Sequence, residues 1–554
     1  MGHGFRGADA LLRTLAGWGV RHVFTCPGST EAAFLTAAAE QDAVEIVLTT
    51  HESVAVAMAD GVARETGRPA VAYLHANVGL TNALSHLAAA RLARSPVVVL
   101  TGLKQLAIQN RGGFTTAPNV RDFVRQYVKW DWRTARPDAV AEDVNRALRI
   151  AATAPQGPTW VGLAQDVVEA EVSDDLPDPR RFAVSGRRRP LAEEIEAAAT
   201  LLTSAARPVI VAGAEVARQG VATLLDLAQR LGAVVLAEDR RTAERSVVPA
   251  DHTSYAGMYG VARECVREAD VLFFAGARCF VEFEAPTAPD LPDDARVIHL
   301  HSDADEVAKI YGVDVALVGD AAATLDELLR TIDPRPPDER RADFRARARE
   351  EHHRLRERAL TPPPRSPDGG QLSAVEVMRE LAGTFDAETT VVGDATTSGG
   401  ALLHAMDLAP AARFHTTSSG SLGWGTGFAL GVQLADPARR VVAVLGDGVF
   451  QFGLPALWTA VRYALPVRFV VINNQSYAAV GAAIRRYTGG MTDAERRMTV
   501  DLSGPDLAAV AAGFGMPASR VITAEQLAAW LTESRDHTGP SLVEVMTDPA
   551  DLGP

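Results

Sequence analysis

The chain contains 554 residues, of which 47% are hydrophobic and 22% are charged, so it is long enough to form several packed domains. Its formal net charge of −14 argues against binding nucleic acid through a broad basic surface. The three cysteines match neither a disulfide framework nor a zinc cluster, and no apolar run reaches the roughly 20 residues of a membrane span. We therefore expect a cytoplasmic protein with no nucleic-acid or membrane partner.

Residues 1–185 form the first predicted domain. Helix-like periodicity alternates here with short Val, Ile and Leu runs, which are typical of buried parallel strands. The runs are Val44–Leu48, Ala70–Leu74 and Pro96–Leu100. Residues 186–190, which contain three arginines and a proline, then predict a linker.

Residues 190–345 form the second predicted domain, in which strand candidates again alternate with helical segments. The candidates are Pro208–Ala212, Ala233–Leu236, Val271–Ala275 and Ala295–Leu300. Arg, Glu and Pro dominate residues 334–370 and hydrophobic periodicity is lost, which predicts a solvated connector helix and loop. The neighbouring His352 and His353 fit this charged, solvated helix better than a catalytic pair.

Residues 365–554 form the third predicted domain, whose α/β pattern runs from Ala374 to about Val545. The segment Phe428–Gly448 repeats the helix, turn, strand and glycine-bearing loop that begin at Met58, which indicates that the first and third domains are related copies. Chance similarity between two such units is the alternative. The predicted fold class is α/β, with three domains that each contain a largely parallel sheet flanked by helices.

A strand followed by a glycine turn indicates an anion site in the third domain. Val441–Leu445 runs straight into Gly446, Asp447 and Gly448, and the following Leu454–Tyr463 stretch has a helical pattern. Glycines let backbone amides approach a phosphate closely without any positive side chain. Asp447 alone would repel a diphosphate, so its place beside the turn predicts a divalent cation, and magnesium is the natural candidate.

A second buried strand, Val467–Ile472, leads into Asn473 and Asn474. Adjacent parallel strands bring such loops together at their carboxyl ends. Asp447, Asn474 and a backbone carbonyl near Ser476 would then supply three oxygen ligands, and phosphate oxygens and water would complete an octahedron. The alternative is that each motif is an ordinary turn or loop end, which is common for either motif alone.

Together, Gly446-Asp447-Gly448 and Asn473-Asn474 resemble the fingerprint of thiamine-diphosphate-dependent enzymes. Nearly the whole chain is similar to the family that contains benzoylformate decarboxylase, pyruvate decarboxylase and acetolactate synthase. This resemblance implies a pyrimidine-binding domain, a central domain and a domain that binds diphosphate and magnesium, in that order. It also implies a homodimer or homotetramer in which two subunits share each active site.

The resemblance assigns further residues to the cofactor. Glu52, at the head of an apolar helical run, matches the glutamate that activates the aminopyrimidine, and an acid that stabilises the helix N-terminus is the alternative. Leu422 matches the apolar wedge that bends the cofactor, and the Gly420 carbonyl would accept a hydrogen bond from the pyrimidine amino group. Thr396 and Val449 are the remaining predicted cofactor contacts.

Two residues are candidates for the substrate side of the site. Ser29 matches the serine of benzoylformate decarboxylase that meets the substrate carboxylate, and a helix cap is the alternative. His75 matches the first active-site histidine of that enzyme, and a hydrogen-bonded histidine at a strand end is the alternative. The second histidine has no counterpart here, because Phe283 takes its place.

The surroundings of the predicted pocket differ from those of benzoylformate decarboxylase. Small residues between Ala478 and Ile484 replace a bulkier aromatic lining, which predicts a wide pocket. Arg111 would be able to reach an anionic acceptor, although an arginine on a surface loop is the simpler interpretation. The flavin segment of anabolic acetolactate synthases is not recognisable, nor is a nucleotide site in the second domain, so neither FAD nor an acyl-CoA is expected.

These features predict an enzyme that uses thiamine diphosphate and Mg²⁺ to decarboxylate a 2-oxo acid. The resemblance implies that the resulting enamine is protonated to release an aldehyde, or is transferred to a second carbonyl or acyl acceptor, as in acetolactate synthase. The missing histidine favours transfer slightly, because an enamine that is protonated slowly lives longer. A catalytically silent paralogue that only binds the cofactor is a third hypothesis, and the presence of Glu52 argues against it.

Overall fold

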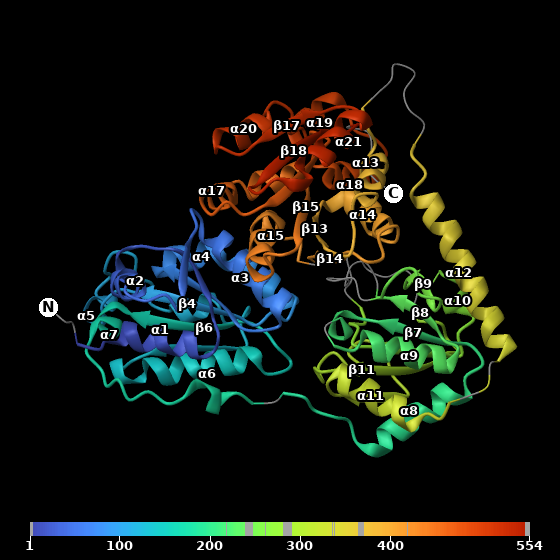
Figure 1. Cartoon of the computed structure of the whole chain (residues 1–554), viewed down its shortest axis with the longest axis horizontal. Helices are drawn as coiled ribbons and strands as arrows, with labels where there is room; N and C mark the ends of the chain where they lie inside the picture. Colours follow the sequence, from blue (N-terminus) through green and yellow to red (C-terminus); the bar gives the residue numbers. More distant parts are fainter. Residues whose placement is uncertain are drawn as a thin grey trace. The chain divides into compact units, whose positions relative to one another are not determined.

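Three six-stranded sheets with flanking helices form the framework of the chain (Figure 1). The structure is a computed structural model, and it describes residues 4–184, 186–217, 219–238, 248–260, 262–280, 291–334, 336, 338–363, 371–417 and 419–548. The predicted α/β fold with three largely parallel sheets is confirmed, because the strand pairs of each sheet are parallel.

Contacts along the chain divide it into two compact units. The first unit contains residues 1–185, 419–521 and 532–545. The second contains residues 186–418, 522–531 and 546–554. All but one of the predicted site residues fall in the first unit, so that unit is described in most detail. The domain boundaries expected near residues 185, 190, 345 and 365 stay predictions.

The first sheet has the strand order β2-β1-β3-β4-β6-β5. Its strands are β1 His22–Cys26, β2 Glu45–Leu48, β3 Ala70–His75, β4 Val97–Leu103, β5 Trp130–Thr134 and β6 Thr159–Ala164. The helices around it are α1 Gly7–Gly17, α2 Ala32–Ala39, α3 Glu52–Thr66, α4 Ala76–Leu92 and α6 Val140–Ala152. Val71 and Tyr73 of β3 belong to the core that the sheet shares with α1 and α6 (Figure 1). All three strands expected here are present, as β2, β3 and β4.

The central sheet has the order β12-β11-β10-β7-β8-β9. Its strands are β7 Pro208–Ala212, β8 Val234–Ala237, β9 Tyr255–Met258, β10 Val271–Ala275, β11 Arg296–His301 and β12 Val315–Val318. The helices beside it are α8 Ala192–Ser204, α9 Val221–Leu231, α10 Glu264–Arg267 and α11 Ala321–Thr331. Successive strands are added in one direction across the sheet from β7 to β9 and in the other direction from β10 to β12. The strand order therefore switches between β7 and β10, as in doubly wound nucleotide-binding folds. All four strands expected here are present.

The predicted connector helix is α12, Glu339–Ala359, and most of its residues are solvated as expected, but one face is not. One of its faces is buried and contains Arg341, Phe344, Ala348 and His352. A guanidinium nitrogen of Arg341 donates to the carbonyl oxygen of Leu231 at 2.6 Å. The burial escaped prediction because an arginine and a histidine occupy two of the four buried positions, so the apolar periodicity is broken.

His352 therefore differs from the exposed residue expected in a solvated helix. Its Nε2 lies 3.2 Å from Oδ2 of Asp407, and its ring meets the ring of Tyr255 edge-on at 5.4 Å. The Tyr255 hydroxyl donates to the same carboxylate at 3.0 Å. His353 is exposed, as expected. The pair thus splits into one packed residue and one solvated residue, and the packed histidine holds α12 in place.

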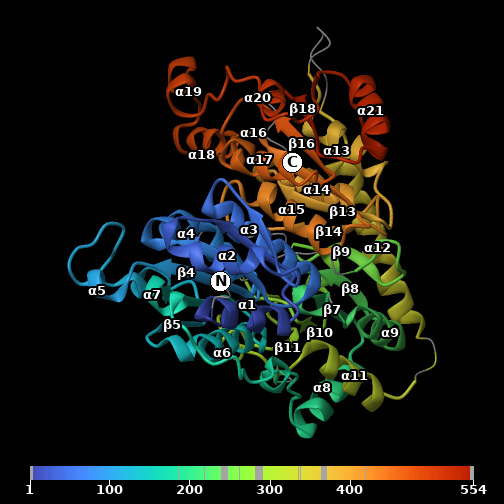
Figure 2. The same cartoon turned by 60° about the vertical axis from the view of Figure 1, so that its left-hand side comes forward.

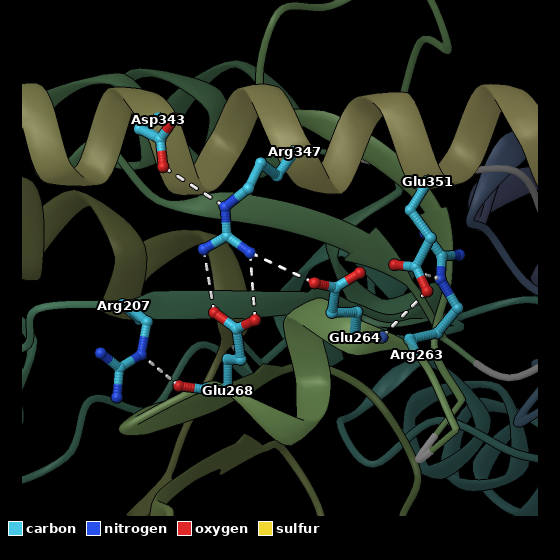
Figure 3. Close-up of polar contacts among 7 residues, drawn as sticks. All are labelled: Arg207, Arg263, Glu264, Glu268, Asp343, Arg347 and Glu351. Carbon is cyan, nitrogen blue, oxygen red and sulfur yellow. Dashed lines mark hydrogen bonds and ion pairs between the residues drawn. The ribbon is translucent and has the colours of Figure 1, made fainter.

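Charged side chains also join α12 to α10 and its flanking residues (Figure 3). Arg347 donates to Glu268 at 2.9 Å and to Glu264 at 3.3 Å, and Arg263 donates to Glu351 at 3.2 Å. The hydrogen bonds from Arg347 lower the pKa of the Glu268 carboxyl. The Arg347 pairs are exposed, and exposed pairs contribute little stability singly, whereas the Arg263–Glu351 pair is mostly buried.

The third sheet has the order β14-β13-β15-β16-β18-β17. Its strands are β13 Thr389–Asp394, β14 Arg413–Thr416, β15 Arg440–Gly446, β16 Val467–Asn473, β17 Ala518–Val521 and β18 Ser541–Met546. Numbered within each sheet, the first and third sheets share the order 2-1-3-4-6-5. This agreement supports the expectation that the two domains are related copies, although common origin stays a prediction.

Helix α15, Trp424–Ala435, packs closely against α3 within the first unit (Figures 1 and 2). A Cβ atom added at Gly61 of α3 would collide with the carbonyl oxygen of Phe428, and one at Gly431 with that of Met58. Trp424 Nε1 donates to the buried Asp60 carboxylate at 2.8 Å. The two helix backbones can approach this closely only because both glycines lack a side chain.

Candidate active site

The glycine turn of the third domain joins β15 directly to a short helix. Gly446 ends the strand with extended backbone, and α16, Asp447–Phe452, begins at the next residue. The helix predicted at Leu454–Tyr463 is the following α17, Pro455–Arg462. A Cβ atom at Gly448 would lie 2.7 Å from the Tyr477 ring, so a larger residue here would have to displace that ring. Gly448 therefore adds no side chain of its own to the turn.

Asp447, Asn474 and Ser476 come together as the sequence predicts. β15 pairs with β16 in parallel and Gly446 lies opposite Ile472, so both loops emerge at the same edge of the sheet. Oδ2 of Asp447 and Oδ1 of Asn474 both accept a hydrogen bond from the Ser476 amide, at 3.2 Å and 3.0 Å. The other carboxylate oxygen of Asp447 accepts from the Gly448 amide at 2.7 Å.

The Asp447 carboxyl is buried, and burial raises its pKa to about 6 against the opposing effect of the backbone amides. A buried carboxylate without a countercharge is unfavourable, and a divalent cation would provide that charge. Within the described part of the chain, no group of three or more His, Cys, Asp or Glu side chains has the geometry of a metal site. A cation at Asp447 would therefore depend on amide, backbone and phosphate oxygens as well, which fits the predicted ligand set.

The two neighbouring asparagines have different tasks. Asn473 is turned into the domain, where its Nδ2 donates to Glu544 at 2.6 Å and its Oδ1 accepts from the Gln475 amide at 2.9 Å. Arg520 donates to the same Glu544 carboxylate at 2.9 Å. Asn473 thus shapes the loop, and Asn474 alone presents its oxygen beside Asp447.

Glu52 is the first residue of α3, but its carboxylate does not cap that helix. The cap is the His51 ring, which accepts from the Ser53 amide at 3.2 Å. Oε2 of Glu52 instead accepts from Nδ2 of Asn82 on α4 at 3.0 Å. A Cβ atom at Gly79 would lie 3.0 Å from the other carboxylate oxygen, so α4 approaches this side chain closely. The geometry matches a carboxyl group held in place for another partner.

Gly420 and Leu422 precede α15. Gly420 is exposed and adopts a left-handed backbone with φ of 64°. Leu422 is half-buried, and its carbonyl oxygen lies 3.3 Å from Nε2 of His86 on α4. The other ring nitrogen of His86 lies 2.8 Å from the carbonyl oxygen of Ser53. Burial lowers the pKa of His86, and a neutral imidazole carries one N–H, so it donates to one of these carbonyls at a time.

His75 lies in a polar cluster at the ends of β1 and β3. Its Nδ1 is 3.0 Å from Oε2 of Glu31 and 2.9 Å from Oγ1 of Thr30. Glu31 is fully buried and also accepts from the Gly28 amide at 2.7 Å. A carboxylate at Nδ1 places the proton on that nitrogen and leaves Nε2 for another partner. Sequence analysis did not identify Glu31 as a site residue.

Ser29 does not act as a side-chain helix cap. It is the first residue of a short 3₁₀ turn, Ser29–Glu31, whose N-cap is Gly28. Its exposed Oγ accepts a hydrogen bond from the Lys104 ammonium group at 3.1 Å. Lys104 follows β4, and nothing in the local sequence singles it out. It is the second residue of this cluster that sequence analysis missed.

The other predicted site residues lie as follows. Val449 is buried in α16, and Arg111 is exposed on its loop. Thr396 is exposed after β13, with φ of 33°, and belongs to the second compact unit. Phe283, which is predicted to replace the second histidine, lies outside the described residues. Their proposed roles, and those of Glu52, Ser29 and His75, stay predictions.

The small residues that follow the asparagines form the start of α18, Ala478–Thr488. Only Ala478 and Gly481 of this helix are buried, and Val480 is 47% exposed. Its exposed residues include large side chains such as Tyr487, so the expected wide pocket stays a prediction.

Three family descriptions of thiamine pyrophosphate enzymes match the chain in order. They are the N-terminal TPP binding domain over residues 5–123, the central domain over 195–328 and the C-terminal TPP binding domain over 394–545. The chain belongs to the thiamine pyrophosphate enzymes. Thiamine pyrophosphate is another name for thiamine diphosphate, so the predicted family is confirmed, and with it the expectation of an enzyme that uses this cofactor.

The chain is similar along most of its length to proteins with several activities, among them benzoylformate decarboxylase, acetolactate synthase and sulfoacetaldehyde acetyltransferase. Benzoylformate decarboxylase of Pseudomonas aeruginosa is 27% identical over 97% of this chain and 98% of its own. A probable acetolactate synthase large subunit of Methanocaldococcus jannaschii is 27% identical over 99% and 93%. Among solved structures, the thiamine diphosphate-dependent 4-hydroxybenzoylformate decarboxylase of Rhodococcus jostii RHA1 has a TM-score of 0.85 and 26% identity, covering 98% of this chain and 99% of its own.

Among the helices that the structure describes, none is both long and apolar enough to cross a lipid bilayer.

Replacing Asp447 by asparagine tests the cost of the buried carboxyl. Because its pKa of about 6 exceeds the unfolded value of about 4, the cofactor-free protein loses stability as the pH rises through this interval. Because asparagine does not ionise, the variant should lose this dependence, and between pH 5 and pH 8 in EDTA its melting temperature should fall by roughly 1–3 °C less than that of the wild type. It should also lose the stabilisation that Mg²⁺ and thiamine diphosphate together provide.

Thermal melts in EDTA at pH 5 and pH 8, and at pH 8 with Mg²⁺ and cofactor, measure both effects. Asp42→Asn is the matched control, because Asp42 is an exposed loop residue in the same compact unit. It should leave the wild-type melting temperatures unchanged. A cofactor-free Asp447→Asn protein that keeps the wild-type pH dependence would contradict the assigned cost.

Proposed function

We propose that this enzyme uses thiamine diphosphate and Mg²⁺ to break the bond between the carboxylate and the carbonyl carbon of a 2-oxo acid. The observation that carries the proposal is the convergence of the Asp447 and Asn474 oxygens beside the Gly446–Gly448 turn, in a chain of this family. Asp447, Asn474 and the Ser476 carbonyl would hold the cation, and the turn would bind the diphosphate. The similarity to both decarboxylases and acetolactate synthases supports the substrate class.

The cofactor supplies a nucleophilic carbon and an electron sink when it is bound. Glu52 would share a proton with the aminopyrimidine, while Nδ2 of Asn82 donates a hydrogen bond to Oε2 of Glu52 and holds the carboxyl group in place. Leu422 would force the cofactor into its bent shape, and the Gly420 carbonyl would accept from the amino group. His75, oriented by Glu31, would move a proton at the reacting carbon through Nε2.

Two products are compatible with this site. Protonation of the reacting carbon releases an aldehyde, as the similarity to benzoylformate decarboxylase suggests, and attack on a second carbonyl or acyl acceptor forms a new carbon–carbon bond. The small residues at the start of α18 favour a site with room for an acceptor. We further propose a cytoplasmic location, because Cys26, Cys265 and Cys279 are free thiols.

A product panel tests the reaction. A set of 2-oxo acids is incubated with the holoenzyme, with and without added aldehydes or second 2-oxo acids. We expect CO₂ release from at least one acid, and a hydroxyketone product when an acceptor is present. Aldehyde as the sole product throughout would exclude the carboligase, and no CO₂ from any acid would overturn the proposed function.

Glu52→Gln tests the activating carboxyl. The amide preserves the shape and the contact with Asn82 but cannot share a proton with the aminopyrimidine. We expect cofactor affinity within about threefold of the wild type and exchange of the cofactor C2 hydrogen slowed by at least about a hundredfold. Calorimetry and NMR-detected deuterium exchange measure the two quantities. Unchanged exchange would remove Glu52 from the mechanism and revive the hypothesis of a catalytically silent paralogue.

We also propose that two copies of the chain share each site in a homodimer or homotetramer, as in the family it resembles. A site within one chain is the alternative, and the packing of α3 against α15 and the contacts of His86 favour it. Glu52→Gln and Asp447→Asn chains, each inactive alone, distinguish the two arrangements when they are co-expressed.

In a shared site, each mixed dimer contains one site with neither substitution. Random pairing should then restore about a quarter of the wild-type activity. In a site confined to one chain, every site carries a substitution and no activity returns. The co-expressed Glu52→Gln protein alone, with two different affinity tags, is the control for the purification of mixed dimers.

A further inference from the structure

Ser29 and Lys104 form a pair of hydrogen-bond donors that the cofactor chemistry does not use. The Lys104 ammonium group donates to Oγ of Ser29 at 3.1 Å, and the serine side is exposed. Because Oγ accepts from the ammonium group, the serine hydroxyl hydrogen is free to donate, and Lys104 keeps two further N–H groups. Among the described residues, Lys104 forms no ion pair with a carboxylate. The pair therefore presents three donors and one unneutralised positive charge.

The charge around this pair is otherwise negative. Ser29 lies next to the cluster of His75 and Glu31, at the ends of the neighbouring strands β1, β3 and β4. Burial, together with the negative charges of Glu52 and Glu31, raises the pKa of the Cys26 thiol to about 11. Two carboxylates thus act on the same strand end. An anionic substrate needs a local cation to enter such a site, and Lys104 is the one that contacts Ser29.

The nature of decarboxylation decides which anionic group suits this receptor. As the bond breaks, its electron pair stays with the carbonyl carbon and the carboxylate becomes neutral CO₂. A cation beside that carboxylate stabilises the reactant more than the transition state, so it slows the step. A cation beside an anionic group that keeps its charge stabilises both equally and improves binding. A strong anion receptor therefore fits a group that survives the reaction.

We propose that Ser29 and Lys104 bind a second anionic group, a carboxylate, sulfonate or phosphonate that is retained in the product. This inference rests on the proposed function and narrows its substrate class. The group belongs either to the 2-oxo acid donor or to the carbonyl acceptor. Lys104 is then a specificity-determining residue, and the site selects dianionic donors or anionic acceptors over neutral-tailed analogues of equal length.

Matched substrate pairs test this selection. The donor pair is 2-oxoglutarate and 2-oxopentanoate, and the acceptor pair is 4-oxobutanoate and butanal, which differ only in the terminal carboxylate. We expect the wild type to prefer the charged member of one pair by at least about tenfold in kcat/KM. Lys104→Met should remove that preference, mainly through KM, and Lys104→Arg should retain it within about threefold. The pair that responds identifies whether donor or acceptor carries the group.

Arg21→Met is the control for removing one positive charge from the same compact unit, because Arg21 is exposed and its side chain forms no hydrogen bond or ion pair among the described residues. It should leave the preference within about twofold. Equal losses for both members of each pair would overturn the proposal, because Lys104 would then act on the scissile carboxylate or on folding. A wild-type enzyme that prefers neither charged substrate would also overturn it.

A binding measurement separates this proposal from the proposed function. Calorimetry of the holoenzyme with the unreactive pairs 2-hydroxyglutarate and 2-hydroxypentanoate, and 4-hydroxybutanoate and 1-butanol, needs no turnover. Tighter binding of the charged member by at least about tenfold, lost in Lys104→Met and kept in Lys104→Arg, would support the receptor even if no 2-oxo acid is decarboxylated. Equal affinities within both pairs would overturn the receptor while leaving the decarboxylase assignment intact.

Discussion

Parallel strand pairing is the constraint on which the candidate active site depends. Six side chains assigned to the substrate, the cofactor or the cation lie at or just beyond the carboxyl end of a strand. Parallel strands place those ends at one edge of their sheet. The residues are Ser29 after β1, Glu52 after β2, His75 at the end of β3, Lys104 after β4, Asp447 after β15 and Asn474 after β16. Chemistry drawn from positions far apart in the chain therefore becomes local once each sheet forms.

This constraint explains why so much of the fold could be predicted from the sequence. A strand buried on both faces is a largely apolar run, so Val441–Leu445 and Val467–Ile472, which is interrupted only by Arg468, are recognisable in the sequence and appear as β15 and β16. The buried face of α12 could not be predicted from the sequence, because polar residues interrupt its apolar pattern. Arg341 and His352 bury polar groups that are hydrogen-bonded or paired with charges, and apolar periodicity cannot report such burial.

The site could be predicted where its residues directly follow strands that are recognisable in the sequence. Asp447 and Asn474 each end a recognisable strand, and the structure brings their oxygens to one amide. No local sequence pattern marks Glu31 or Lys104 as site residues. Their partners, His75 and Ser29, lie at the ends of other strands. Likewise, only contact with the distant Glu544 shows that Asn473 is turned inward. Long-range pairing, rather than local pattern, therefore limits what the sequence can reveal.

The contact between α3 and α15 has a consequence for the evolution of the chain. Gly61 and Gly431 each face the backbone of the opposite helix, so a mutation that adds even one carbon atom at either position separates the helices and displaces what they carry. Glu52 begins one of these helices and Leu422 precedes the other. Selection on the chemistry at those ends must therefore preserve two glycines that never touch a reactant, and descendants with altered substrates should inherit this crossing unchanged.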